Sequence, residues 1–208
     1  MDHLDLVMQK GYQTGDWSDI TMLDNAGEAL YALNLLHEKI PGDQLYGITL
    51  DVYTYSRIPF PKRRILDLRK IRPSDYLKDF PEKLADIDPV VIYRATLNGD
   101  AKEVRKEISW TTNKDTALFF YGRNLHIGFK EVHLYQGTIE KSKIIAYTNQ
   151  RNEFEVLQHM GVRNIEEVTV SMPEVKSIMD KHAHEIKKQW EEITCNYQMQ
   201  HGNQKAGE

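Results

Sequence analysis

The stretch RNEFEVLQHMG, Arg151 to Gly161, places two glutamates one residue apart, directly before the apolar residues Val156 and Leu157. The composition of this stretch predicts a strand, and residues two apart lie on the same face of a strand because its side chains alternate. Glu153 and Glu155 are therefore expected on one face, although neighbouring like charges repel each other. Two interpretations stay open: a solvated strand face, or a site that needs two carboxylates aimed at one point.

The composition is that of an ordinary globular chain, with 208 residues of which 40% are hydrophobic and 28% are charged. A net charge of −4 gives no general attraction to nucleic acid or to anionic membranes, so neither is indicated as a partner. The single cysteine, Cys195, excludes an internal disulfide and a multi-cysteine site, and we expect no metal. Residues 1–17 lack the layout of a signal peptide, and no apolar run reaches membrane-spanning length. These observations predict a soluble, cytoplasmic protein.

Residues 1–88 are expected to form an N-terminal helical and connecting part. Residues 24–42 have apolar positions at helical spacing, and Asn25 with Glu28 resembles a capping box, so a helix is predicted there. Residues 44–56, QLYGITLDVYTYS, are rich in β-formers and predict one strand or a hairpin.

A proline-rich connector follows over residues 59–88, and one short helix is expected after Ser74. It carries a basic cluster, which is interpreted as a solvated face, with a patch for an acidic partner or nucleic acid as the alternative. The cluster consists of Lys62, Arg63, Arg64, Arg69, Lys70 and Arg72.

Residues 89–172 contain several short strands with one intervening helix, which predicts an α+β fold with a β-sandwich or split-barrel core. The strands are expected at 90–96, 107–112, 131–139, 142–147, 153–157 and 165–170, and the helix at 114–123. Residues 173–208 predict an amphipathic helix followed by a polar, disordered tail at 199–208. The apolar stripe of that helix comprises Val175, Ile178, Met179, His182, Ile186, Trp190 and Ile193. All three parts are expected to form one compact domain.

Three of the expected strands carry polar or aromatic residues near their ends: Tyr93 with Arg94, then Ser109, Trp110 and Thr111, then Glu153 with Glu155. Their order resembles that of the ADP-ribosyltransferases of the R-S-E class, the arginine-specific toxin type found in bacteria and phages. That class has an aromatic-arginine pair, a Ser-x-Ser/Thr motif and a Glu-x-Glu motif on successive strands. The resemblance covers about residues 89–170 and departs from the pattern at Ala95, where relatives often carry glycine.

The resemblance implies an ADP-ribosyltransferase-like split β-sandwich and NAD as the substrate. Cleavage of the bond between nicotinamide and ribose passes through an oxocarbenium-like state, which the carboxylate of Glu155 would stabilise. Glu153 is implied to orient or deprotonate the acceptor, and Ser109 to stiffen the site around Glu155. Arg94 is implied to hold the phosphates of NAD. Tyr93, Ser109, Trp110 and Thr111 are also expected in the NAD site, with the ring of Trp110 or Phe154 stacking on the ligand.

The expected function is mono-ADP-ribosyl transfer from NAD to a macromolecular acceptor of unknown identity, with protein arginine favoured. One alternative is an NAD glycohydrolase, in which water replaces the acceptor, and another is a non-catalytic binding module. Taken singly, each motif is more often an exposed strand face, a surface ion pair or a turn residue. The presence of Arg94, Ser109 and Glu155 together argues against the binding module, and Glu153 favours transfer over hydrolysis. A phage-encoded protein of this type would act in the cytoplasm of the host.

Overall fold

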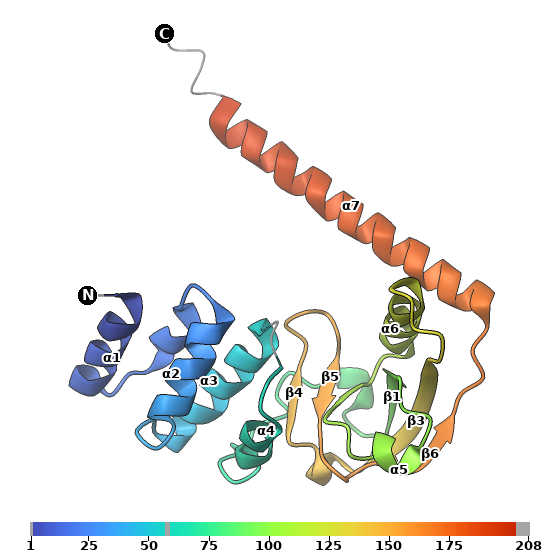
Figure 1. The fold of residues 1–208 in the computed structure, drawn as a ribbon, viewed down its shortest axis with the longest axis horizontal. Helices are drawn as coiled ribbons and strands as arrows, with labels where there is room; N and C mark the ends of the chain where they lie inside the picture. The colour runs from blue at the N-terminus through green and yellow to red at the C-terminus, as the bar shows by residue number, and fades with distance from the viewer. Residues whose placement is uncertain (1, 57–58, 203–208) are drawn as a thin grey trace.

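The computed structural model describes residues 2–56 and 59–202 of the chain and shows a helical part beside a sheet (Figure 1). The helical part contains four α-helices and two short 3-10 turns in its described residues. They are α1 (His3–Thr14), a turn at Ser18–Met22, α2 (Ala26–Leu36), α3 (Gly42–Tyr55), α4 (Lys62–Leu68) and a turn at Glu82–Leu84. The predicted helix within residues 24–42 is confirmed as α2, and the side chain of Asn25 accepts a hydrogen bond from the backbone N–H of Glu28.

The strand or hairpin predicted for residues 44–56 is wrong, because this segment forms α3. Its buried residues include Leu45, Ile48, Thr49 and Val52, and this spacing places them on one face of a helix. The β-branched and aromatic residues lower helix propensity only modestly, so the burial of that face against α2 decides the structure.

The connector also differs from the prediction. Residues 74–79 form turns rather than the expected helix, and the helix in this region is α4, which begins earlier, after Pro61. The basic cluster is more than a solvated face, because three of its side chains donate hydrogen bonds to backbone carbonyls of the β-rich part. Lys62 donates to Lys106, Arg69 to His159, and Arg72 to Ser142 and Ile144. The connector therefore fastens the helical part to the sheet.

The β-rich part contains one six-stranded antiparallel sheet with the order β4-β5-β2-β1-β3-β6, and it is not closed. Its strands are β1 (Val90–Thr96), β2 (Ser109–Thr111), β3 (His133–Ile139), β4 (Ala146–Thr148), β5 (Glu155–Leu157) and β6 (Arg163–Glu167). Two helices connect them, α5 (Ala101–Val104) and α6 (Lys114–His126). The predicted α+β class is confirmed, although hydrogen bonding joins all described strands into a single sheet rather than the two sheets of a sandwich.

The sheet is nearly divided between β1 and β2. These strands share only the register pair Tyr93 with Thr111, whereas β1 pairs with β3 over its whole length. On its other side β2 pairs fully with β5. The ends of β1 and β2 therefore diverge, and this opening is where the predicted site residues lie.

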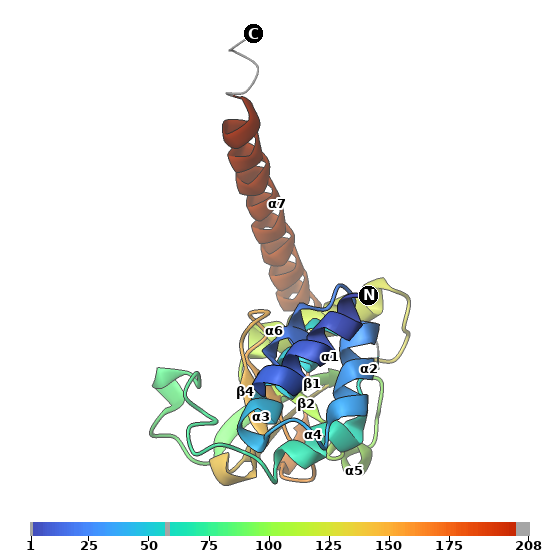
Figure 2. The same ribbon diagram turned by 90° about the vertical axis from the view of Figure 1, so that its left-hand side faces the viewer.

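The two faces of the sheet are covered differently. One face packs against residues 76–84 and α5, and its core includes Val90, Ile92, Val104, Trp110 and Val156. The opposite face has two separate covers. In Figure 2 the helical part faces the viewer, and α1, α2 and α3 lie in front of the sheet. Helices α3 and α4 cover β4 and β5, through Tyr46, Ile65, Leu68, Ala146 and Leu157. Helix α6 covers β1 and β3, through Ala117, Leu118 and Leu134. Between these covers, part of the face stays open.

Helix α7 (Met172–Gly202) packs its first turns on α6 and then projects from the body (Figure 1). Of the predicted stripe, Val175, Ile178 and Met179 pack on α6, and His182 stacks on Phe119 with ring centroids 4.2 Å apart. The helix includes residues 199–202, which were expected in the tail, and residues 203–208 lie outside the described part, as do the side chains of Trp190 and Ile193. No helix in the described ranges is both long and apolar enough to cross a membrane.

Gly11→Ala is expected to destabilise the protein by about 1–3 kcal/mol, which is the usual cost of overpacking. A Cβ at this position would lie 2.3 Å from Cε3 of the buried Trp17 indole. Gly47→Ala in α3 is the matched control, because a Cβ there meets nothing within 4 Å. The control should raise the free energy of unfolding by up to about 1 kcal/mol. Urea denaturation followed by circular dichroism measures both, and a shift of both variants in the same direction would contradict the packing described.

Candidate functional site

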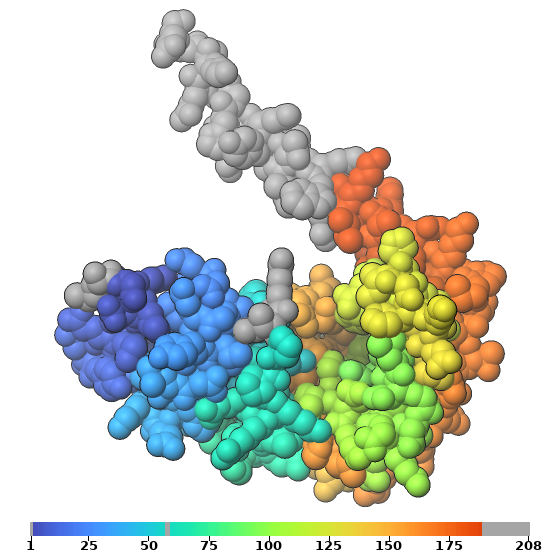
Figure 3. Space-filling model, viewed as in Figure 1, coloured from blue at the N-terminus to red at the C-terminus, as the bar shows by residue number. Residues whose placement is uncertain are grey.

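A cavity of about 390 Å³ opens between the two helical covers, over the divergence of β1 and β2. We call it the cleft, and the space-filling view shows the molecule hollowed between the helical part and α6 (Figure 3). Its lining residues are Tyr53, Tyr93, Arg94, Ala95, Ser109, Trp110, Thr111, Ala117, Phe120, Arg123, Asn124, Arg151, Glu153 and Glu155. The structure thus brings together all seven site residues named from the sequence, although up to 62 positions separate them along the chain.

Glu155 lies at the start of β5 and is only 4% exposed. Its Oε1 atom accepts hydrogen bonds from the hydroxyl of Ser109, at 2.5 Å, and from the hydroxyl of Tyr53, at 2.7 Å. Its Oε2 atom is buried and receives no hydrogen bond from the described residues. Two neutral donors therefore fix one oxygen of a buried carboxylate, while among the described residues the other oxygen accepts no hydrogen bond and has only the Arg151 guanidinium beside it, at 3.6 Å.

Tyr53 is a site residue that the sequence analysis missed, because its segment was predicted as a strand of the N-terminal part. Burial raises the pKa of Tyr53 well above its usual range, and the negative charge of Glu155 raises it further, so the hydroxyl keeps its proton and donates. Tyr46, two helical turns earlier, likewise donates to the Ile145 carbonyl at 3.2 Å. Tyr46 and Tyr53 are seven residues apart, a spacing that places both on one face of a helix, and this spacing could have indicated a helix that faces the β-rich part.

Glu153 does not lie on the strand, so the prediction that it shares a strand face with Glu155 is wrong. Strand β5 begins at Glu155, and Phe154 between them has a φ of 51°, a left-handed conformation that interrupts the alternation. The Thr111 hydroxyl donates to the Glu153 carbonyl at 2.7 Å, and the Asn149 side chain accepts from the Phe154 N–H at 3.0 Å. These bonds fix the loop so that the Glu153 carboxylate still reaches the cleft.

Arg151 forms ion pairs with both neighbouring glutamates, Glu153 and Glu155. Its Nη2 atom lies 2.9 Å from Oε2 of Glu153 and 3.6 Å from Oε2 of Glu155. One guanidinium group therefore contacts both carboxylates, which reduces the repulsion expected between them. Burial raises the pKa of Glu153, and the positive charge of Arg151 opposes this effect.

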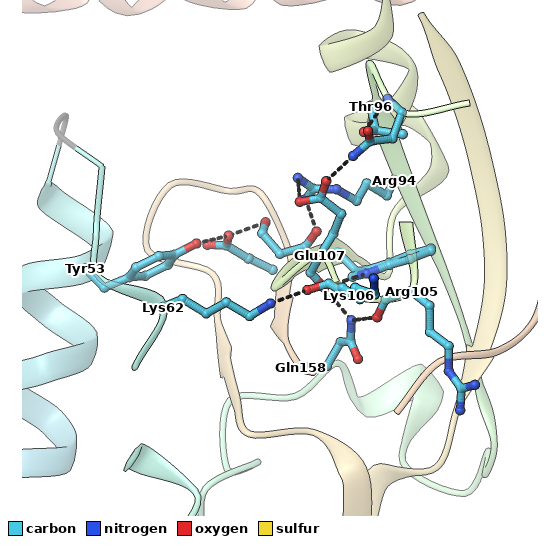
Figure 4. Close-up of polar contacts among 12 residues, drawn as sticks. Tyr53, Lys62, Arg94, Thr96, Arg105, Lys106, Glu107 and Gln158 are labelled. Carbon is cyan, nitrogen blue, oxygen red and sulfur yellow. Dashed lines mark hydrogen bonds and ion pairs between the residues drawn. The ribbon is translucent and has the colours of Figure 1, made fainter. Parts of the chain in front are cut away.

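Arg94 bridges the opening of the sheet. Backbone hydrogen bonds join Gln158 N–H to the Ile108 carbonyl and Thr112 N–H to the Phe154 carbonyl, so these residues of the β2 segment face β5. Because successive residues of a strand direct their backbone groups to opposite sides, the carbonyl of Ser109 points towards β1. The guanidinium of Arg94 donates to that carbonyl and also to Glu107 at 3.1 Å (Figure 4). Burial lowers the pKa of Arg94, and Glu107 opposes this shift. Arg94 thus uses both terminal nitrogens within the protein, where the sequence analysis expected them to face phosphates.

The aromatic residues at the cleft also differ from the expectation. The ring of Trp110 belongs to the core on the other face of the sheet, is 2% exposed and donates to the Glu107 carbonyl, so it is not free to stack on a ligand. Phe154 packs against the same core. Tyr93 and Phe120 line the cleft instead, and the guanidinium of Arg123 lies 4.7 Å from the centre of the Phe120 ring.

Comparison of the chain with models of protein families, with curated proteins and with solved structures found no match. Within the described ranges, no three His, Cys, Asp or Glu side chains are grouped so that they could hold a metal ion. The chemical groups that the cleft itself offers include two carboxylates, three guanidinium groups and the hydroxyl groups of Tyr53, Tyr93, Ser109 and Thr111.

Tyr53→Phe is expected to lower the free energy of unfolding by about 1.5–3 kcal/mol, the usual worth of a hydrogen bond to a charged group. The physical reason is that Glu155 would stay buried with one donor fewer on Oε1. Tyr55→Phe is the matched control at the end of the same helix, because Tyr55 is 67% exposed, and it should change stability by less than about 0.5 kcal/mol. Equal stability of the two variants in chemical denaturation would show that the Tyr53 hydroxyl does not hold Glu155.

Proposed function

We propose that this chain is a mono-ADP-ribosyltransferase, which cleaves NAD and transfers ADP-ribose to a macromolecular acceptor, preferably a protein arginine. One observation carries the proposal. Glu155 is a buried carboxylate that lines the cleft, held on one oxygen by Ser109 and Tyr53, while within the described ranges its other oxygen accepts no hydrogen bond and is paired only with Arg151, at 3.6 Å. The nearly divided sheet beneath the cleft supports the split sandwich of the R-S-E class as the fold.

The fixed carboxylate suits the cleavage of a glycosidic bond. When the bond between nicotinamide and ribose lengthens, positive charge grows on the ribose. A carboxylate that is already oriented stabilises this charge without reorganisation, so it favours the transition state over the ground state. Ser109 and Tyr53 provide that orientation, and we assign the ribose to the Oε2 atom of Glu155, which accepts no hydrogen bond from the described part of the chain.

The pair of carboxylates suits a guanidinium acceptor. Arg151 shows that a guanidinium nitrogen fits between Glu153 and Glu155 at ion-pair distance. An incoming arginine must also lose a proton as it attacks, and a carboxylate with a raised pKa is a better base than an ordinary one. Burial raises the pKa of Glu153 in this way, so we assign the role of general base to Glu153.

The phosphates of NAD need a cation that the protein does not already use. Both terminal nitrogens of Arg94 donate to Glu107 and to the Ser109 carbonyl. Only its Nε atom, which is buried and has no hydrogen-bond partner among the residues described, is left to bind a phosphate. Arg123 lines the same cleft from α6, stacked on Phe120 and beside Asn124. We therefore propose that Arg123 is the main residue that binds the phosphates, and that Arg94 stabilises the sheet beneath the cleft.

NAD hydrolysis is the second candidate, and one observation favours it. Arg151 occupies the position between the carboxylates that an acceptor arginine would take. As long as it stays there, water is the nucleophile with the easiest access to the cleft. The two functions share the cleavage step, so separate assays of cleavage and transfer distinguish them.

Glu155→Gln is expected to reduce both nicotinamide release and label transfer from NAD by about 10²–10³-fold, as for the loss of one electrostatic stabiliser elsewhere. The amide keeps the shape and removes the negative charge that faces the ribose. Glu131→Gln is the control, because Glu131 is exposed and lies outside the cleft. Normal turnover by the Glu155→Gln protein, with its fold verified, would remove this residue from the chemistry.

Glu153→Gln should reduce transfer to an arginine-rich protein by about 10²–10⁴-fold, the range for general base catalysis, while nicotinamide release without acceptor largely persists. Because the pKa of Glu153 is raised, its ionised form is lost at a higher pH than for an ordinary glutamate. Acidification should therefore lower the ratio of transfer to hydrolysis in the wild type, starting above the ordinary pKa of 4.5, and leave it flat in the variant. A parallel loss in both assays would assign Glu153 a structural role only.

A further inference from the structure

We infer that Arg151 is itself an acceptor, so that the protein attaches ADP-ribose to its own Arg151 within the cleft. The inference rests on the proposed function and concerns a different residue. Arg151 lies in the loop before β5, and its side chain is 41% exposed. Its Nη2 atom contacts the carboxylates that we assign to the base and to the ribose, at 2.9 and 3.6 Å.

The Arg151 guanidinium already lies beside Glu153 and Glu155, a position that a free acceptor would reach only by diffusion. A nucleophile that is covalently held beside the reacting group gains a large effective concentration, on the order of 10⁵ M or more in well-oriented cases. Arg151 is separated from Glu153 by one residue and from Glu155 by three, so the loop delivers nucleophile, base and ribose carboxylate together. In the absence of another acceptor, Arg151 is therefore the guanidinium that already contacts both carboxylates.

The other arginines of the cleft lack this placement. Arg94 is buried and donates to Glu107 and to the Ser109 carbonyl, so its nitrogens are directed away from Glu153. Arg123 rests on the Phe120 ring, and among the described ion pairs it makes none with Glu153 or Glu155. Arg151 is the cleft arginine whose proton already faces a carboxylate with a raised pKa.

The reaction balances without any further reactant. A terminal nitrogen of Arg151 forms a bond to C1′ of the ribose, and the bond from C1′ to the pyridinium nitrogen of nicotinamide breaks. The electron pair of that bond stays on the ring, so nicotinamide leaves as a neutral molecule. The attacking guanidinium passes one proton to the carboxylate of Glu153, which releases it to solvent, and the modified guanidinium keeps its positive charge.

The test is to incubate the purified full-length protein with NAD and no other acceptor, and to map the modification by mass spectrometry with electron-transfer fragmentation. We expect one ADP-ribose on Arg151, formed at a rate per molecule that does not depend on protein concentration. Arg151→Lys should lose this label, whereas Arg163→Lys should keep it, because Arg163 is exposed and pairs with Glu140 outside the cleft. The lysine in each variant preserves the charge.

A mixing experiment separates reaction within one molecule from reaction between two. Wild-type protein is mixed with a Glu155→Gln protein that carries a mass tag and an intact Arg151 and is expected to cleave NAD about 10²–10³-fold more slowly. Label should appear on Arg151 of the wild type and not on the tagged chain. Label on the tagged chain would overturn the inference that the residue reacts in its own cleft.

Two failures are distinguishable. If nicotinamide is released while Arg151 stays unmodified, the inference about Arg151 is wrong and the proposed cleavage of NAD stands. If neither nicotinamide release nor label is seen, the proposed function and the inference both fall.

Discussion

The structure depends on the hydrogen bonds that hold the Glu155 carboxylate. A buried carboxylate is costly unless donors satisfy it, and here the donors come from Ser109 on β2 and Tyr53 on α3. The same oxygen therefore links β5 to its neighbouring strand and to a helix of the N-terminal part. That helix is consequently part of the site rather than an appendage, and the carbonyl contacts of Lys62, Arg69 and Arg72 fasten its neighbourhood to the sheet.

The cleft exists because the sheet is incompletely paired and incompletely covered. Strands β1 and β2 share one register pair. The guanidinium of Arg94 donates a hydrogen bond to the Ser109 carbonyl, which would accept a backbone N–H from β1 if the two strands paired further. Above this opening, α3 and α4 cover one side and α6 covers the other, which leaves a polar gap between two apolar cores. A continuous ladder or a single helical layer would have buried these polar residues without room for a ligand.

Arg151 connects the electrostatics of the cleft with both proposals. Without a cation, Glu153 and Glu155 would face each other across a partly buried space, and Arg151 relieves that repulsion. The same contact shows that a guanidinium group fits between the two carboxylates. Under the proposed function, an acceptor arginine would have to displace Arg151 from this position, or Arg151 would itself be the acceptor.

The sequence by itself determined β1, β3, α2 and α6, because their apolar patterns repeat at the period of the element and their caps are local. It also named residues that meet in the cleft, through the order of short motifs. Tertiary structure decided α3, whose β-forming residues become helical because one face is buried against other helices. It also decided the roles of Tyr53, Arg151 and Glu107. Tyr53 lies 102 positions from Glu155, and the left-handed Phe154 that turns Glu153 into the cleft follows from loop hydrogen bonds rather than from any periodicity.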